Sequence, residues 1–173
     1  MARRIEHRST SAWPASEVHA ALIDYRYLTD RLVELGGPNA ALVTHAPTED
    51  GGVHVQLSQD VPADSLPALA RTVVGDDLTI DRSESWRRVD EGQYTGEIAA
   101  EIKGAPCSIT GSMWLHDLPE PTPTAVSEFV VSGSVRVNMP FVAGKLEDLV
   151  AEQVEKLLVA EETFTHDWLT RRA

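Results

Sequence analysis

Several kinds of feature are scarce in this sequence, and each absence excludes a class of protein. The chain of 173 residues has one cysteine, Cys107, so no disulfide forms within it and a reducing compartment is expected. The N-terminal segment MARRIEHRST lacks the apolar core of a signal peptide, and no run approaches the ~20 apolar residues of a membrane span. We therefore expect a cytoplasmic protein without stable insertion in a membrane.

Basic residues are also scarce. Lysine and arginine number 15 against 27 aspartate and glutamate residues, which gives a formal net charge of −12. A surface with this charge repels phosphate backbones and anionic headgroups. The basic clusters at the two ends, Arg3-Arg4 and Arg171-Arg172, are interpreted as solvated side chains, so we expect no nucleic-acid partner.

No catalytic or metal-binding motif is present. The sequence contains no HExxH, GxSxG, P-loop or GxGxxG pattern, and its six histidines are scattered without paired metal-ligand spacing. Cys107 has no candidate base near it in the sequence. We therefore predict no metal, no cofactor and no catalytic residue.

What the sequence does contain is the composition of a soluble globular protein. Hydrophobic residues make up 42% of the chain and charged residues 24%. A length of 173 residues suits one domain with a sizeable core, so we expect a single domain over residues 1–173.

The first third of the chain predicts one strand and two short helices. Residues 3–11 alternate weakly between apolar and polar, which is typical of a strand. Residues 14–35 have helical periodicity, with Pro14 suited to a first turn and Gly36-Gly37-Pro38 as a stop. We expect a break between the two helices near residues 25–29.

The apolar period then changes to two, which predicts strands. Residues 41–47 and 53–61 flank the turn sequence TEDGG and form a hairpin. Residues 64–75 are expected to be irregular or briefly helical, because Pro67 limits a helix there. Four further strands follow at residues 78–89, 93–103, 107–116 and 124–137. The short connections predict that the last six strands form an antiparallel meander.

The segment VNMPFVAGKLEDLV, residues 137–150, joins the last strand to a helix of about thirty residues. Pro140 cannot extend a strand ladder, and Phe141 and Val142 are expected to anchor the helix start. Gly144 either allows a close backbone approach or is a tolerated small residue. One helix face is apolar, with Val142, Leu146, Leu149, Val150, Leu157, Ala160, Phe164 and Trp168 on it. Mostly opposite lie Glu147, Asp148, Glu152, Glu155 and Lys156.

This helix requires a long apolar partner, and the sheet is the only candidate. Thirty residues of helix span roughly 45 Å. A large sheet twists and curls, which leaves space between its concave face and the helix. Aromatic residues make up only 6% of the chain, and inward strand positions include small residues such as Ala99 or Ala100, Gly111 and Gly133. The space between sheet and helix is then either a ligand cavity or a core filled by ordinary side-chain packing.

The order of elements resembles that of the START-like helix-grip superfamily, which includes polyketide cyclases and lipid-transfer domains. The segments VNMPFVAGKLEDLV and FTHDWL are similar to an uncharacterised bacterial branch of that superfamily, and AWPASEVHAALID to its usual first helix entry. The resemblance implies an α+β helix-grip fold. In this fold a seven-stranded antiparallel sheet curls around a long C-terminal helix, and two short helices lie between strands 1 and 2.

We predict that a hydrophobic or amphipathic small molecule, or a lipid, binds between sheet and terminal helix without catalysis. This predicts a closed apolar cavity of roughly 300 Å³ or more. Gln153 is the best polar contact. The predicted ligand-binding residues are Trp86, Tyr94, Ile98, Ile109, Met113, Phe129, Leu146, Leu149, Gln153 and Leu157.

Two other functions remain open at this stage. A polyketide cyclase or aromatase needs titratable groups converging in the pocket, and the candidates are Arg82, Glu84, Tyr94 and Gln153. The strand face that carries Arg82, Glu84 and Trp86 suits either the pocket wall or the outer surface, and Glu161 is expected at a solvated rim. A protein-interaction module with a filled core is the third function, and the protein is expected to be a monomer or homodimer.

Overall fold

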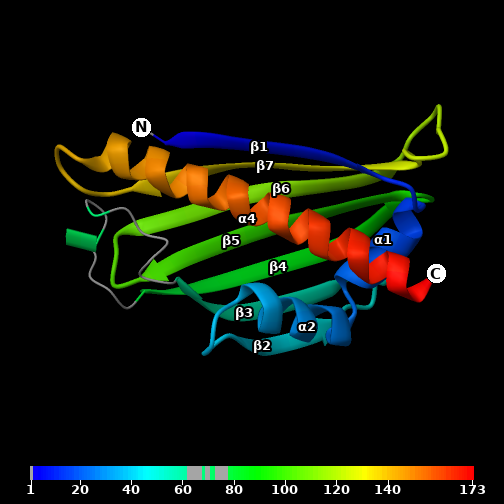
Figure 1. Ribbon diagram of the computed structural model, residues 1–173, viewed down its shortest axis with the longest axis horizontal. Helices are drawn as coiled ribbons and strands as arrows, with labels where there is room; N and C mark the ends of the chain where they lie inside the picture. Colours follow the sequence, from blue (N-terminus) through cyan, green and yellow to red (C-terminus); the bar gives the residue numbers. More distant parts are fainter. Residues whose placement is uncertain (1, 62–67, 69–70, 73–77) are drawn as a thin grey trace.

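The computed structural model describes residues 2–61, 68, 71–72 and 78–173 (Figure 1). The expected irregular or helical stretch at 64–75 lies largely outside the described residues. The strands are β1 (Arg3–Ser11), β2 (Ala41–Pro47), β3 (Val53–Val61), β4 (Leu78–Asp90), β5 (Gln93–Lys103), β6 (Cys107–Asp117) and β7 (Ser127–Val137). The helices are α1 (Ala15–Leu22), α2 (Tyr25–Leu35) and α4 (Ala143–Arg172).

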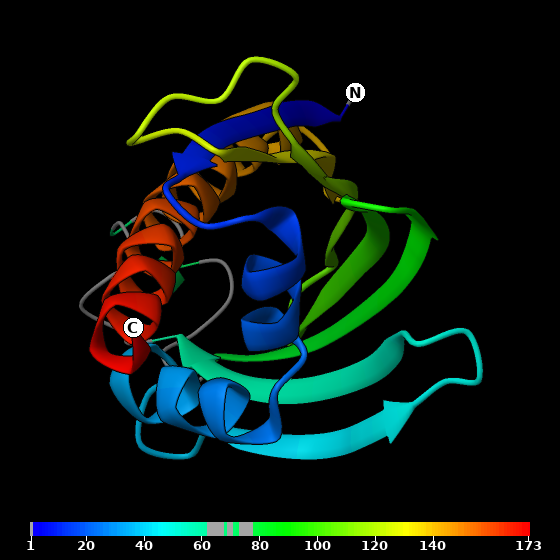
Figure 2. The same ribbon diagram turned by 90° about the vertical axis from the view of Figure 1, so that its right-hand side faces the viewer.

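All seven strands form one antiparallel sheet in the order β1-β7-β6-β5-β4-β3-β2. The predicted meander of the last six strands is confirmed, and β1 joins it by pairing with β7 from Arg3↔Val135 to Ser11↔Ser127. Figure 2 shows the sheet curved around α1, with α4 closing the open side. The predicted α+β helix-grip fold is therefore confirmed.

The terminal helix α4 runs over thirty residues, Ala143–Arg172, as expected. It packs against β1 and β7 and also against α1 and α2. No helix within the described part of the chain is long and apolar enough to cross a bilayer.

The entry to α4 differs from the prediction at Phe141. This side chain is fully exposed, and its backbone has a φ of 69°, so it does not anchor the helix. The Val142 N–H donates to the Pro140 carbonyl at 2.9 Å, and this tight turn directs the Phe141 side chain outward. Val142 alone fulfils the prediction, because it packs against buried residues such as Leu146.

Gly144 is a tolerated small residue, and no close backbone approach requires it. A Cβ atom added there would meet nothing within 4 Å. Close approach occurs instead between β6 and β7, where Gly111 and Gly133 are direct partners. A Cβ atom on Gly133 would lie 2.5 Å from the Thr110 carbonyl oxygen, so the two strands need glycine at this position.

The break between the first two helices lies at Ile23 and Asp24, earlier than predicted. The Asp24 carboxylate accepts a hydrogen bond from the Tyr27 N–H at 3.0 Å and thereby caps α2. An N-cap aspartate satisfies a backbone donor at the helix start, so it decides where the helix begins. As a result Tyr27 and Leu28 fall in the first turn of α2 and are fully buried.

β7 begins at Ser127, and the predicted start at residue 124 was too early. Thr122 and Ala125 hydrogen-bond to each other's backbone in a turn, which keeps residue 124 out of the ladder. The Val126 N–H then donates to the Ser11 carbonyl at 2.7 Å, and the pairing with β1 follows from Ser127.

Glu147 is a second correction on α4, because it was expected on the outer polar face. It is buried, and its Oε1 accepts a hydrogen bond from the Val137 N–H at 3.0 Å. The helix begins so soon after β7 that its first turn lies over the strand end. The carboxylate therefore satisfies a buried backbone donor, as a buried polar group requires.

Candidate functional site

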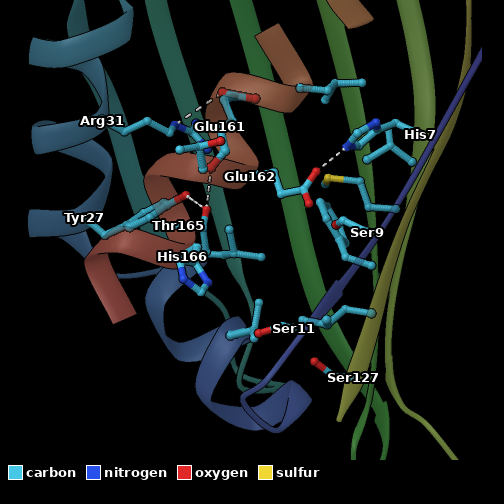
Figure 3. A pocket seen from close by; sticks show the side chains of 18 of the residues that line it. His7, Ser9, Ser11, Tyr27, Arg31, Ser127, Glu161, Glu162, Thr165 and His166 are labelled. Atoms are coloured by element: carbon cyan, nitrogen blue, oxygen red, sulfur yellow. Dashed lines mark hydrogen bonds and ion pairs between the residues drawn. The ribbon is translucent and has the colours of Figure 1, made fainter. Parts of the chain in front are cut away.

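A pocket of about 260 Å³ lies between the inner face of the sheet, including its edge strand β1, and the C-terminal half of α4 (Figure 3). Its strand residues are His7, Ser9, Thr10 and Ser11 of β1, Arg82, Glu84 and Trp86 of β4, Ile98 of β5, Met113 and Leu115 of β6, and Ser127, Phe129 and Val131 of β7. Its helix residues are Val18 and Leu22 of α1, Tyr27 and Arg31 of α2, and Leu158, Glu161, Glu162, Thr163, Thr165, His166 and Leu169 of α4.

The floor of the pocket is apolar because the alternation of four strands directs large side chains inward. Trp86, Gly96, Met113 and Val131 occupy consecutive positions across β4, β5, β6 and β7. A Cβ atom on Gly96 would approach Met113 and Trp86 within 2.9 and 3.1 Å. Gly96 therefore leaves room for the two large neighbours, which fill the floor beneath the pocket.

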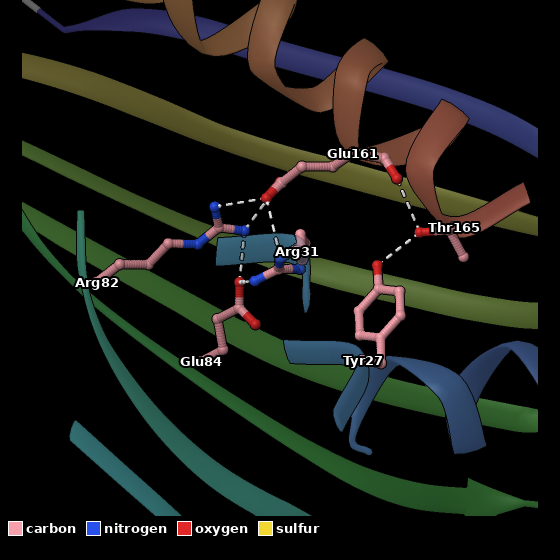
Figure 4. A network of polar contacts seen from close by, with 6 residues as sticks. All are labelled: Tyr27, Arg31, Arg82, Glu84, Glu161 and Thr165. Carbon is pink, nitrogen blue, oxygen red and sulfur yellow. Dashed lines mark hydrogen bonds and ion pairs between the residues drawn. The ribbon is translucent and has the colours of Figure 1, made fainter. Parts of the chain in front are cut away.

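One wall of the pocket is a buried cluster of four charged residues, which we call the Arg–Glu quartet: Arg31, Arg82, Glu84 and Glu161 (Figure 4). Arg82 donates from Nη1 and Nη2 to the two oxygens of Glu161, at 2.9 and 3.1 Å. Arg82 also pairs with Glu84, and Arg31 Nη2 lies 3.5 Å from Glu84 Oε1. The quartet thereby joins α2, β4 and α4, three elements that are distant in the sequence.

Counter-ions favour the charged forms of Arg31, Arg82 and Glu161. Burial alone would lower the pKa of Arg31 and Arg82, but Glu161 and Glu84 outweigh it and raise both pKa values. Burial alone would raise the pKa of Glu161, but Arg82 and Arg31 reverse this and lower it.

Two expectations about these residues are thereby decided. The strand face with Arg82, Glu84 and Trp86 forms the pocket wall, not the outer surface. The prediction that Glu161 lies at a solvated rim is wrong, since the residue is buried and pairs with arginine side chains.

A hydrogen bond next to the quartet ties α2 to α4. The Tyr27 hydroxyl lies 2.6 Å from Thr165 Oγ1, and Thr165 in turn donates to the Glu161 carbonyl at 2.8 Å. Burial raises the pKa of Tyr27, so the phenol stays neutral. The pair holds the helix that carries Glu161 against α2 and so supports the quartet.

The opposite side of the pocket is polar and more exposed. His7 Nε2 and Glu162 Oε2 are 2.9 Å apart and connect β1 to α4, as Figure 3 shows. Ser9 and Ser11 follow along β1 on the same side. These serines and the His7–Glu162 pair make this side of the pocket polar.

Comparison with known proteins identifies the family. A family model described as "Protein of unknown function (DUF2505)" matches residues 6–169. The chain belongs to this family. The uncharacterized protein Rv0481c of Mycobacterium tuberculosis is 34% identical to this DUF2505 chain over 158 residues, which cover 89% of each.

Solved structures with the architecture of this DUF2505 chain include Ara h 8.0201, with a TM-score of 0.58 and 16% identity over 99% of both chains. A START superfamily protein from Mycobacterium smegmatis has a TM-score of 0.53 and 14% identity, over 95% of this chain and 98% of that one. Norcoclaurine synthase from Thalictrum flavum, in complex with dopamine and hydroxybenzaldehyde, has a TM-score of 0.52 and 16% identity, over 100% and 89%. These neighbours share the helix-grip fold that the resemblance implied.

The pocket of the DUF2505 chain collects some of the predicted ligand-binding residues and not others. Trp86, Ile98, Met113 and Phe129 line it. Tyr94 lies outside the lining and stacks on His19, with ring centroids 4.0 Å apart. Ile109, Leu146 and Leu149 belong to a packed cluster, and Gln153 and Leu157 are partly buried on α4; all five lie outside the lining. Ligand contact by any of the ten stays a prediction.

Sequence reasoning missed Arg31, Tyr27 and the residues of β1. Arg31 lies on the same stripe of its helix as Leu28, Leu32 and Leu35, and this placement was the available signal. A charged residue on an apolar stripe is buried only with a partner. For His7 and Ser9 the sequence had no such signal, because β1 alternates only weakly.

No cluster of three or more metal-ligating side chains occurs in the described ranges of the DUF2505 chain. Cys107 is buried, and burial together with Glu147 raises the pKa of its thiol to about 11. The thiol is therefore protonated at neutral pH and unsuited to nucleophilic attack.

A buried histidine, His19 on α1, gives the fold a dependence on pH. It stacks on Tyr94 and packs edge-on against Trp86, and its Nε2 has no hydrogen-bond partner among the described residues. Burial lowers the pKa of His19 from 6.5 to about 4. The unfolded chain therefore takes up a proton at a higher pH than the folded protein does.

We expect acid to destabilise the protein through His19. Between pH 8 and pH 5 the free energy of unfolding should fall by about 2 kcal/mol from this residue, because the unfolded state alone is protonated there. His19→Phe should remove that part of the pH dependence, as measured by urea unfolding at both pH values. His54→Phe, at an exposed position on β3, is the control. An unchanged pH dependence in His19→Phe would contradict the assignment.

Proposed function

We propose that this DUF2505 chain binds a hydrophobic or amphipathic small molecule, without catalysis, in the pocket between the sheet and α4. The observation that carries the proposal is the pocket of about 260 Å³ with an apolar floor and one charged wall. Its floor side chains are Trp86, Ile98, Met113, Leu115, Phe129 and Val131.

The binding energy would come from the floor and the orientation from the charged wall. Burial of apolar surface contributes about 25 cal/mol per Å². The volume lies just below the usual range of small-molecule pockets, which begins at about 300 Å³. It is also slightly smaller than the cavity predicted from the sequence. A single acyl chain or a compact ring system therefore suits it better than a two-chain lipid.

The comparisons support the binding of a small molecule, and the pairing of the pocket charges bears on whether catalysis accompanies it. Norcoclaurine synthase has the same architecture and was solved with dopamine and hydroxybenzaldehyde. For catalysis, Arg82 and Glu84 do lie in the pocket, but they pair with each other and with Glu161 and Arg31. A cyclase needs a group free to transfer a proton. This pairing favours binding ahead of catalysis.

We further propose that the protein works in the cytoplasm as a monomer or homodimer, with a small molecule or lipid as its partner and no nucleic acid. Its single cysteine is typical of a reducing compartment, and its net charge of −12 disfavours phosphate backbones.

Filling the pocket should weaken binding. We expect Ile98→Trp to lower the affinity for decanol by about tenfold or more, measured by isothermal titration calorimetry, because the indole occupies space that the ligand needs. Ser9→Phe fills the pocket from the β1 side and is the second blocking variant. Val159→Trp, on the exposed face of α4, is the matched control and should bind as the wild type does.

Thermal unfolding of each variant separates loss of the pocket from loss of the fold. The proposal fails if the wild type binds neither decanol nor decanoate, or if both folded blocking variants bind decanol as tightly as the control. Native mass spectrometry of the purified protein, before and after organic extraction, then identifies any small molecule that it already carries.

A further inference from the structure

The Arg–Glu quartet is a net-neutral charged cluster in an almost dry place. Arg31 and Glu84 are each 4% exposed, and Arg82 and Glu161 are each 7% exposed. Two guanidinium groups face two carboxylates, so the formal charges cancel. The members come from α2, β4 and α4, and the cluster is complete without a ligand.

The quartet nevertheless has donors that the protein leaves unpaired. Among the described residues, neither Arg31 Nε nor Arg82 Nε has a hydrogen-bond acceptor. Arg31 Nε lies 3.5 Å from Glu161 Oε2, which gives electrostatic attraction without a hydrogen bond. A buried donor without an acceptor is unfavourable, so an oxygen that reaches it is bound favourably. Both arginines line the pocket, so guanidinium groups form part of its polar wall.

The charge around the pocket disfavours an anionic ligand. Glu162 lines the opposite side, where it pairs with His7, and His166 lies one helical turn further along α4. The lining holds three carboxylates and two guanidinium groups beside the two histidines. A carboxylate brought in by a ligand would be a fourth negative charge, and charges in a poorly solvated site interact strongly.

We propose that the pocket selects an amphipathic ligand whose polar end is an uncharged oxygen acceptor, a hydroxyl or carbonyl, and that it rejects the corresponding carboxylate. The polar end lies at the Arg–Glu quartet and accepts a hydrogen bond from a guanidinium N–H, while the apolar part covers Trp86, Met113 and Phe129. This inference rests on the proposed function and adds the chemical class of the ligand.

The test compares decanol with decanoate, two ligands of equal chain length that differ in the charge of the polar end. At pH 8, where decanoate is ionised, we expect wild-type protein to bind decanol about tenfold or more tightly than decanoate in titration calorimetry. Glu84→Gln preserves the shape of the side chain but gives the quartet one excess positive charge. We expect this variant to bring the affinity ratio close to one or to reverse it.

The matched control is Glu152→Gln, which makes the same change of charge on the exposed face of α4 and should leave the ratio unchanged. The inference is overturned if the wild type binds decanoate as tightly as decanol, or if the two glutamine variants have the same ratio. In those outcomes the proposed function stands, because a ligand is bound. If neither ligand binds, the proposed function and the inference fail together. If Glu84→Gln does not fold, the wild-type ratio alone decides the question.

Discussion

Replacing Arg82 by methionine is expected to lower the free energy of unfolding by about 3–5 kcal/mol. Arg82 pairs with both carboxylates of the Arg–Glu quartet. Methionine fills a similar volume but leaves Glu84 and Glu161 buried with only Arg31 between them. Two buried carboxylates with one counter-ion are strongly unfavourable, so the loss exceeds what a surface ion pair contributes. Chemical denaturation followed by circular dichroism measures it.

A double variant tests whether the loss comes from uncompensated charge. Arg82→Met combined with Glu161→Leu removes one positive and one negative charge, and the remaining pair, Arg31 and Glu84, stays balanced. We expect the double variant to be less destabilised than the sum of the two single variants by about 1–3 kcal/mol.

The control for the Arg82 series is an arginine whose ion pair is exposed. Arg3 lies 3.6 Å from Asp148, with both side chains more than half exposed. Arg3→Met should change stability by no more than about 0.5 kcal/mol. An Arg82→Met variant as stable as Arg3→Met would show that the quartet is not the buried, tightly coupled cluster described here.

Replacing Trp86 by alanine is expected to cost about 3–5 kcal/mol of stability and to enlarge the pocket. The Trp86 ring is buried, packs against His19 and Phe129, and forms part of the pocket floor. Its removal deletes a large apolar contact and leaves a cavity that the rigid strands cannot close. Indole added in solution should bind in that cavity and raise the melting temperature of the variant.

Trp114→Ala is the matched control for Trp86→Ala. Trp114 lies on β6 at the outer face of the sheet, where it is partly exposed beside His116. We expect a clearly smaller loss of stability and no response to indole. If indole stabilises both variants equally, or neither, then Trp86 does not form the floor of a pocket.

The sequence alone determined the order and nature of the elements. The period of two between residues 41 and 137 and the helical period after residue 142 predict the strands and α4, because each pattern reflects contacts within a few residues. Boundaries were less certain where a side-chain cap decided them. Asp24 begins α2 earlier than the apolar stripe indicates, since its carboxylate binds a single backbone N–H.

The tertiary structure alone decided which charged residues are buried. Arg82 and Glu161 are 79 positions apart, and each resembles a solvent-facing residue in its own local pattern. Their burial is possible because β4, α2 and α4 bring opposite charges together. The local hydrophobic pattern of each element contains no information about these contacts between distant elements. The site of the pocket has the same origin. It lies under Leu158, Glu161 and Thr165 and not under Leu149 and Gln153, because α4 packs closely on β7 near its start and leaves room toward its end.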